Sequence, residues 1–481
     1  MSSSRRGGER GALAIVLHTH MPYVEGFGTW PFGEEWLWEA IVGSYLPLLD
    51  LLDTGAPLTL SLTPVLCDQL EANGVYGRFT AFVEQVRKHT HAEDAAGLRR
   101  GGHEQLALEL ERSWQEYEDA LEALTRRGGD LLAALAPHAQ WTSAATHAVL
   151  PLLASDAGVS LQLRSGIASH RARFETPSRS WRGGLWLPEC GYEARLEALL
   201  EHAGVRASCV ELTGRFGLGA REHLQPLAGE AGVVLVPIDR ASIALVWSDD
   251  GYPADGVYRD YHHHTIHHHN PWSNDGSPYD HTRALARARE HAADFVARTI
   301  ARLRDAGSGL PGGGLAVFAV DTELLGHWWY EGVAWLTAVV EECARQGLEL
   351  LRLDDALERC EPAPWPTGAR ERAGSWGSHG DLSTWSGPAV AEIAFATRAA
   401  ELAVLGAGAR AGEAAVRELL ALQASDWAFM SARGIAAAYA RERFEGHRDR
   451  VARSLSDGPD ASTEALRNLA PHAHRSLLFG P

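Results

Sequence analysis

Cysteine is scarce in this chain, and its few occurrences do not suggest a structural role. The five residues lack the paired spacing of a metal site, and their odd number does not suit a disulfide framework. We therefore expect reduced thiols and a cytoplasmic protein. The cysteines are Cys67, Cys190, Cys209, Cys343 and Cys360.

Long apolar runs and positive charge are lacking as well. No segment approaches the roughly 18 apolar residues of a membrane span. Arg5, Arg6 and Arg10 precede an apolar run that is short and has no cleavage site, which favours a strand over a signal peptide. The formal net charge of −18 argues against nucleic acid and anionic membranes as partners, because both require a basic surface. A neutral ligand requires neither sign of charge.

Short apolar runs rich in Val, Ile and Leu recur along the chain, and most are followed by a turn and a helical period. This alternation predicts an α/β fold with a parallel sheet closed into a barrel. The predicted strands are residues 12–17, 58–63, 184–188, 207–211, 233–238, 315–320 and 348–353.

Two regions depart from this alternation. Residues 72–135 are charged, rich in Ala, Leu and Glu, and helical in period, which predicts a helical insertion. The sequence Glu-Pro-Ala-Pro-Trp-Pro at 361–366 indicates a rigid linker, and Ala-rich helices follow it. The predicted domains are a barrel of residues 1–71 and 136–360, an inserted helical domain of 72–135, and a C-terminal α-helical domain of 361–481.

Three of the predicted strands end in ionisable residues. One ends at Asp321, which precedes a second carboxylate, a histidine and three consecutive aromatics. Another ends at Glu189, and the first strand in the chain ends in His18 and His20. Active sites of α/β barrels lie at the carboxyl ends of the strands, so these residues predict a shared catalytic face. Independent strand ends are the alternative.

Carboxylates combined with tryptophan are typical of sugar binding, because indole faces cover the apolar face of a pyranose. The chain has 16 tryptophans against three methionines, although filling the core is the ordinary role of tryptophan. Cleavage of a glycosidic bond needs one carboxylate as nucleophile or base and one acid for the leaving oxygen, and Glu189 and Asp321 fit these roles. A separation of roughly 5 Å would predict a retaining reaction. The alternative is that both residues cap helices.

The histidines leave two interpretations open. His18 and His20 point the same way on a strand, so with Asp321 they could bind a metal or hydrogen-bond sugar hydroxyls, and the nearby aromatics favour the sugar. Six of the residues 262–269 are histidines, but no cysteine or patterned acid accompanies them. A solvated loop or helix face is therefore favoured over a metal site there. Asp426, on a predicted helix, matters if the C-terminal domain closes over the barrel mouth.

Several motifs together resemble glycoside hydrolase family 57, and within it the 1,4-α-glucan branching enzymes. They occur in the family's order and span nearly the whole chain. The motifs are His18-Thr19-His20-Met21-Pro22-Tyr23, Ala145-Thr146-His147, Trp186-Leu187-Pro188-Glu189-Cys190-Gly191-Tyr192, Ala319-Val320-Asp321-Thr322-Glu323-Leu324-Leu325-Gly326-His327-Trp328-Trp329, Gly374-Ser375-Trp376-Gly377 with Trp385, and Ala424-Ser425-Asp426-Trp427.

The resemblance implies a (β/α)7 barrel with a helical insertion and a C-terminal helical domain. It implies that Glu189 is the nucleophile, that Asp321 is the general acid/base, and that no metal or other cofactor takes part. The implied partner is an α-1,4-glucan, amylose or a glycogen-like polymer, and we expect a monomer or weak oligomer. The implied substrate-binding residues are His18, His20, His147, Arg240, Trp247, His327, Trp376, Trp385 and Asp426.

One departure from the family pattern leaves the acceptor open. Branching enzymes of the family carry a tyrosine on a long loop over the active site, whereas residues 193–251 contain no tyrosine and form a short segment. The expected function is a retaining branching enzyme that transfers a cleaved segment to a 6-hydroxyl. Water or a 4-hydroxyl as acceptor would make an α-amylase or a 4-α-glucanotransferase. More distant alternatives are a non-catalytic glucan-binding protein and a metal-dependent deacetylase using His18, His20 and Asp321.

Overall fold

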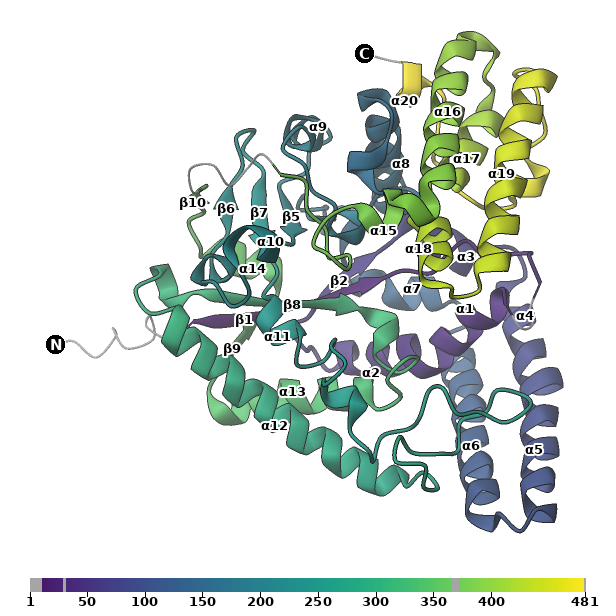
Figure 1. Cartoon of the computed structure of the whole chain (residues 1–481), viewed down its shortest axis with the longest axis vertical. Helices are drawn as coiled ribbons and strands as arrows, with labels where there is room; N and C mark the ends of the chain where they lie inside the picture. The colour runs from purple at the N-terminus through teal and green to yellow at the C-terminus, as the bar shows by residue number, and fades with distance from the viewer. Residues whose placement is uncertain (1–10, 29–31, 366–371, 480–481) are drawn as a thin grey trace.

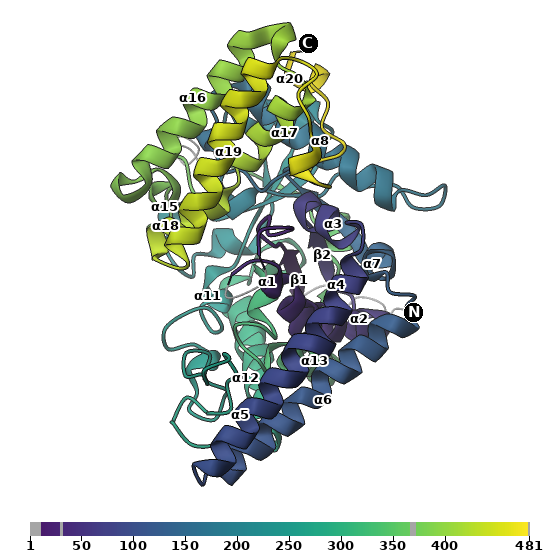
Figure 2. The same ribbon diagram turned by 90° about the vertical axis from the view of Figure 1, so that its right-hand side faces the viewer.

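A curled, mostly parallel sheet surrounded by helices lies at the centre of the molecule (Figure 1). The computed structural model of the chain describes residues 11–28, 32–365 and 372–479. The C-terminal helices and a long helical hairpin lie at opposite ends of the molecule (Figure 2). Within the described ranges, no helix combines the length and the apolar composition needed to cross a membrane.

Seven parallel strands follow one another around the barrel. β8, β1, β2, β3 and β4 are hydrogen-bonded neighbours, a parallel bridge between Gly184 and Ala207 leads from β4 to β5, and β5 pairs with β7. The backbone N–H of Asp239, just after β7, donates to the carbonyl of Val317 in β8 at 2.8 Å, which completes the ring. The ring strands are β1 (Ala12–Thr19), β2 (Thr59–Leu62), β3 (Ala139–Ser143), β4 (Leu185–Trp186), β5 (Ala207–Val210), β7 (Val234–Pro237) and β8 (Leu315–Asp321).

The predicted fold class, an α/β barrel of seven strands, is confirmed, although one strand was missed and one was misplaced. Strand β3 reads Ala-Gln-Trp-Thr-Ser and lacks the aliphatic run by which the others were found. Residues 348–353 contain β9 (Glu349–Leu351), which pairs with the start of β1 and lies outside the ring. β1 is buried from Leu13 to Thr19, as expected for a parallel strand covered on both faces.

The helices around the barrel follow the expected periodicity. The longest, α12, is capped by Asp280, whose carboxylate accepts from the N–H of Arg283 at 3.0 Å. It buries Ala284, Ala288 and Ala292 at four-residue spacing and packs against α13. The helices of this layer are α1 (Glu34–Ala40), α2 (Leu46–Asp53), α3 (Pro64–Leu70), α7 (Leu131–Leu135), α8 (Asp156–Phe174), α9 (Leu196–His202), α10 (Thr213–Phe216), α11 (Arg240–Ile243), α12 (His281–Ala306), α13 (Gly332–Gln346) and α14 (Leu353–Leu357).

Residues 72–135 are helical, and two of their helices form the long hairpin in Figure 2. The hairpin helix α6 buries Leu106, Leu110 and Leu124 on one face and packs against α5. The helices after β2 and α3 are α4 (Val75–Ala81), the π-helical turn η2 (Phe82–Arg87), α5 (Lys88–Arg100) and α6 (Glu104–Arg126).

The C-terminal helices share a core with the barrel. Their apolar cluster, which includes Leu419 and Trp427, also takes in Tyr23, Val65 and Ala145 from segments of the barrel. The C-terminal helices are α15 (Ser383–Ser386), α16 (Ala391–Ala407), α17 (Glu413–Leu422), α18 (Ser425–Arg433), α19 (Ala437–Asp457) and α20 (Ser476–Phe479). This shared core fixes α18 beside the strand ends.

The predicted linker is bound to the barrel along part of its length. Its strand β10 (Ala363–Pro364) pairs with β6 (Leu227–Ala228), which in turn runs antiparallel to β7. Trp365 stacks on Tyr192, with 6.0 Å between ring centroids. Pro366 lies outside the described residues, as do Arg5, Arg6 and Arg10. The domain boundaries stay predictions.

A close contact between two glycines joins the segment between α1 and α2 to the turn after β8. The π-helical turn η1 (Ile41–Tyr45) contains Gly43, and a Cβ there would lie 2.7 Å from the carbonyl oxygen of Gly326. Gly326 has φ +101°, and a Cβ on it would overlap the carbonyl of Gly43. Only glycine at both positions allows the two backbones to approach this closely.

We expect Gly326→Ala to lower the free energy of unfolding by about 2 kcal/mol or more, because the new Cβ meets backbone and the residue is held at positive φ. The matched control is Gly276→Ala, where φ is +82° but nothing lies within 4 Å of the added Cβ. Chemical denaturation of both variants measures the difference. An equal loss in the two would show that the contact with Gly43 contributes nothing.

Candidate active site

The predicted catalytic residues lie at the carboxyl ends of two parallel barrel strands, β8 and β4. Asp321 is the last residue of β8, and in the sheet register it lies directly opposite His18 of β1. Glu189 follows β4 within the single turn η5 (Pro188–Cys190). The parallel sheet therefore brings side chains from three distant segments to one face, as the strand-end pattern predicts.

The carboxyl group of Glu189 is held by two donors from the C-terminal part of the chain. The indole N–H of Trp376 donates to Oε2 at 2.8 Å, and the hydroxyl of Ser425 donates to Oε1 at 2.8 Å. Glu189 itself is 9% exposed and has φ +60°, a left-handed conformation that is strained for a non-glycine residue. The surrounding contacts thus fix the carboxylate in one orientation.

A hydrogen-bonded chain connects this carboxylate to the first strand. His147 Nδ1 lies 2.9 Å from Ser425 Oγ, and His147 Nε2 lies 2.8 Å from His18 Nε2. An ionised Glu189 only accepts hydrogen bonds, so Ser425 gives its proton to Glu189 and accepts from His147 Nδ1–H. His147 Nε2 must then accept from His18 Nε2–H. The network therefore assigns the tautomer of both histidines, which are neutral because burial, reinforced by the neighbouring imidazoles, lowers the pKa of each well below its usual range.

His20 is the cation of the site. Its Nε2 lies 2.9 Å from Asp426 Oδ1, its Nδ1 lies 3.3 Å from Thr63 Oγ1, and its ring stacks on His147 with 3.9 Å between centroids. Burial lowers the pKa of His20, but the charge of Asp426 and its hydrogen bond, together with two further carboxylates, raise it above its ordinary value. A protonated His20 then compensates part of the negative charge around it.

Asp321 and Glu189 have different electrostatic surroundings. Burial raises the pKa of Asp321 well above its usual range, and the charges of Glu323 and Glu189 raise it further. Burial also raises the pKa of Glu189, but its hydrogen bonds from Trp376 and Ser425 oppose this rise. Two carboxyl groups whose surroundings separate their proton affinities are suited to an acid and a nucleophile at one bond.

Glu323 is buried beside Asp321 and adds to this separation. It accepts a hydrogen bond from the hydroxyl of Tyr45 at 2.6 Å and one from the backbone N–H of His20 at 3.2 Å. Burial raises the pKa of Glu323 to about 7, against the effect of the Tyr45 hydrogen bond. Its charge is therefore present above neutral pH, where it helps Asp321 to keep its proton.

Two family models match this chain. The model described as glycosyl hydrolase family 57 matches residues 140–365, and the model described as 1,4-alpha-glucan branching enzyme, C-terminal, matches residues 390–474.

Relatives match over almost the full chain. A 1,4-alpha-glucan branching enzyme of Thermococcus kodakarensis is 32% identical over 499 residues, which cover 90% of this chain and 72% of that protein. A probable 1,4-alpha-glucan branching enzyme of Mycobacterium tuberculosis is 32% identical over 499 residues, 91% of this chain and 90% of that protein. The crystal structure of a family 57-type branching enzyme from Pyrococcus horikoshii matches with a TM-score of 0.87 at 30% identity and covers 97% of this chain and 96% of that chain. The chain belongs to glycosyl hydrolase family 57.

The structure brings five of the predicted substrate-binding residues of this family 57 protein to Glu189 or its hydrogen-bonded neighbours: His18, His20, His147, Trp376 and Asp426. The other four lie elsewhere. Arg240 begins α11, with its guanidinium 3.9 Å from Glu211, and Trp247 is 46% exposed on the loop that follows α11. Trp385 is 3% exposed in the C-terminal core, and His327 lines a separate cavity. Substrate contact stays a prediction for all nine.

Three residues of the site had been given no role from the sequence: Tyr45, Ser425 and Glu323. Ser425 lies in the motif that contains Asp426, and Glu323 lies two residues after Asp321, so both were within reach of motif reading. Tyr45 carried no such signal, because its approach to Glu323 depends on how η1 packs against the turn after β8.

The metal interpretations gain no geometric support. Within the described ranges, no group of three or more His, Cys, Asp or Glu side chains is arranged to hold a metal ion. Residues 262–269 form a mostly exposed loop, as predicted, but His269 is buried against α5. All five cysteines are free, and only Cys360 is not buried.

We expect Glu323→Gln to move the alkaline limb of the pH profile to lower pH by roughly one unit. The limb reports loss of the proton that Asp321 must donate, and the charge of Glu323 raises the pKa of Asp321, so removing that charge lowers it. Measurement of kcat/KM for glucan cleavage over a range of about pH 6 to 10 tests the expected shift. Glu331→Gln, at a buried carboxylate outside the site, is the control, and an unmoved limb in Glu323→Gln would refute the coupling.

We expect Trp376→Phe to reduce kcat/KM about 10- to 100-fold and to move the acidic limb to higher pH, because Glu189 loses a donor that stabilises its ionised form. The control is Trp335→Phe, which removes a buried indole N–H that bonds to no described residue. If the rate falls with no change in the acidic limb, Trp376 acts by packing rather than through its hydrogen bond.

Proposed function

We propose that this family 57 protein is a retaining 1,4-α-glucan branching enzyme. The observation that carries the proposal is the occurrence, at the same end of the barrel, of an oriented, hydrogen-bonded carboxylate and a carboxyl group of strongly raised pKa. The branching activity named for relatives that match nearly all of this chain supports the choice of reaction. Cytoplasmic location and a role in storage-glucan synthesis are part of the proposal.

In the first half of the proposed reaction, Asp321 protonates the glycosidic oxygen as that bond breaks. Glu189 attacks the anomeric carbon, and a glucan segment is held as a covalent glycosyl-enzyme. Ser425 and Trp376 keep the carboxylate of Glu189 in the orientation that the attack needs. Their hydrogen bonds stabilise the charged form of the nucleophile without supplying it a proton.

In the second half, Asp321 acts as a base. It removes the proton from a 6-hydroxyl of an acceptor glucan, whose oxygen attacks the anomeric carbon and displaces Glu189. The product is an α-1,6 branch, and Asp321 is protonated again for the next cleavage. The imidazolium of His20, paired with Asp426, compensates part of the negative charge, which lies on Glu189 before cleavage and on Asp321 in the glycosyl-enzyme.

One observation favours an α-amylase or 4-α-glucanotransferase with the same catalytic pair. The stretch between β5 and β7 contains two short helices, α10 and η6 (Arg221–Leu224), and the two-residue strand β6, and it has no tyrosine. A site with less cover admits water to the glycosyl-enzyme more readily. The acceptor, rather than the catalytic residues, therefore separates the two candidates.

The deciding experiment incubates pure enzyme with linear amylose and counts reducing ends before and after treatment with an enzyme that cuts only α-1,6 bonds. We expect a large rise that appears only after this treatment. A rise already present beforehand, with no further increase, would identify a hydrolase. New chain lengths without new reducing ends or branches would identify a 4-α-glucanotransferase.

Glu189→Gln and Asp321→Asn are the matched controls for this experiment, because each keeps the shape of the side chain and removes its charge. We expect Glu189→Gln to abolish turnover, and Asp321→Asn to lower it by about 10²- to 10⁴-fold. Substantial activity in Glu189→Gln would refute its assignment as nucleophile. Glucan binding without any product from the wild type would indicate a non-catalytic binding protein.

A further inference from the structure

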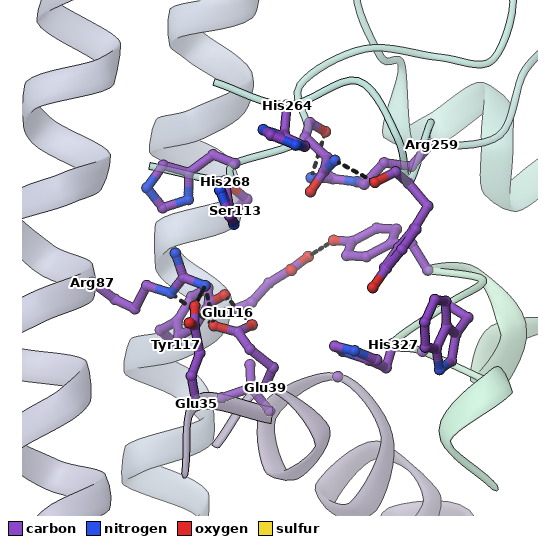
Figure 3. Close-up of a pocket in the computed structure, with 18 of the residues that line it drawn as sticks. Glu35, Glu39, Arg87, Ser113, Glu116, Tyr117, Arg259, His264, His268 and His327 are labelled. Atoms are coloured by element: carbon purple, nitrogen blue, oxygen red, sulfur yellow. Dashed lines mark hydrogen bonds and ion pairs between the residues drawn. The ribbon is translucent and has the colours of Figure 1, made fainter. Parts of the chain in front are cut away.

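A cavity distinct from the contacts around Glu189 lies between the barrel and the helical hairpin α5–α6. Its volume is about 340 Å³, within the range of small-molecule sites. Figure 3 shows side chains from the hairpin, from α1 and from the loop before α12 facing one shared space. Among the sequence-predicted site residues, His327 alone lines it.

The walls of this cavity offer aromatic faces. Trp328 is 42% exposed, and its ring centroid lies 4.6 Å from that of Tyr261. Trp36, Tyr117 and Tyr330 also line the cavity. Tryptophan rings in a protein core are covered, whereas the ring of Trp328, which lines the cavity, is partly exposed. These faces suit the apolar face of a pyranose ring.

The charges in the cavity are paired with one another. Arg87 contacts Glu35 at 2.7 Å and Glu39 at 2.5 Å, and the hydroxyl of Tyr117 donates to Glu39 at 2.6 Å. On the opposite wall, Arg259 forms an ion pair with Glu109. Because these charges compensate each other, the cavity offers hydrogen-bonding groups rather than one strong charge. Such a lining favours an uncharged ligand with many hydroxyls over an ion.

The cavity shares a wall with the catalytic centre. Trp328 donates its backbone N–H to the carbonyl of Glu323 at 3.2 Å, and Tyr45 bonds the carboxylate of the same residue. Gly43 and Gly326, which pack against each other, line the cavity from the same two segments. One face of η1 and of the turn after β8 therefore serves the catalytic centre, and the other serves the cavity.

The wall shared by the cavity and the catalytic centre lies on the side of Asp321, where the acceptor is expected to bind. Glu189 is supported from the C-terminal helices, whereas the cavity is built on the turn that follows Asp321. The acid that protonates a glycosidic oxygen stands beside the departing sugar, and the acceptor later binds where that sugar left. We propose that this cavity binds glucose units of the acceptor α-glucan, with Tyr261 and Trp328 as stacking residues. The proposal rests on the proposed function.

The histidine-rich loop, residues 262–269, follows Tyr261 directly and is bonded to the hairpin. His267 Nδ1 lies 2.8 Å from Asp94 Oδ1, and His269 Nε2 lies 3.1 Å from Thr90 Oγ1, so the loop is tied to α5. His264 and His268, which are exposed, lie at the cavity (Figure 3). The loop thus connects the hairpin to the barrel by hydrogen bonds, and we assign it this structural role rather than metal binding.

The test compares Tyr261→Ala and Trp328→Ala with two controls that lose an exposed apolar side chain outside the cavity. These are Ile266→Ala, in the same loop and 82% exposed at that position, and Phe395→Ala, on α16 and 75% exposed. Amylose is the donor, and maltoheptaose labelled at its reducing end is the acceptor. The half-saturating concentration of labelled acceptor is measured together with total amylose cleavage.

We expect this concentration to rise about tenfold in either cavity variant, and a larger share of the amylose cleavage to end in hydrolysis. The control variants should match the wild type. Unchanged acceptor saturation in both cavity variants would overturn the proposal. If an alanine variant is poorly folded by its thermal melt, Tyr261→Leu and Trp328→Leu replace it, because leucine retains most of the apolar volume.

A second arm separates failure of this inference from failure of the proposed function. Maltoheptaose is titrated calorimetrically into Glu189→Gln, with and without Trp328→Ala, so that no turnover is needed. Weaker binding in the double variant supports the cavity site even if the wild type proves to be a hydrolase. Equal binding, with normal branching by the wild type, leaves the proposed function standing and refutes the cavity as a glucan site.

Discussion

The site depends on the two hydrogen bonds that orient the carboxylate of Glu189. Their donors, Trp376 and Ser425, lie 187 and 236 residues further along the chain. A buried carboxylate is costly unless donors satisfy it, so the barrel alone would leave Glu189 poorly solvated and unoriented. The C-terminal helices therefore complete the candidate active site, and their shared core with the barrel is what holds the two donors in place.

The same interaction organises the neutral histidines. The direction of the hydrogen bonds from His18 through His147 and Ser425 is set by a carboxylate that can only accept. His20 stands outside this chain and takes its charge from Asp426. Burial is the main reason why the pKa of Asp321 rises, and the charges of Glu323, Glu189 and Asp426 raise it further, while the imidazolium of His20 opposes them. Burial and mutual repulsion act in the same direction there.

Several features were accessible to sequence reasoning for clear physical reasons. An aliphatic run that ends at a carboxylate marks a buried parallel strand and its active-site end, so β8 with Asp321 was found directly. β3 was missed because its residues are mostly polar, and its place is secured by pairing with β2 and β4 rather than by its own composition. The predicted linker contains β10, whose pairing with β6 is a long-range contact that local pattern does not reveal.

The sequence by itself determined the α/β class and the family, and it singled out Glu189 and Asp321 as the predicted catalytic pair, because strand periodicity and motifs can be read along the chain. Tertiary structure alone decided that Tyr45 reaches Glu323, that Ser425 bonds Glu189, and that the histidine-rich loop connects the hairpin to the barrel. These contacts join segments far apart in the chain. Their partners are chosen by how helices and loops pack around the barrel, and no single segment encodes that packing.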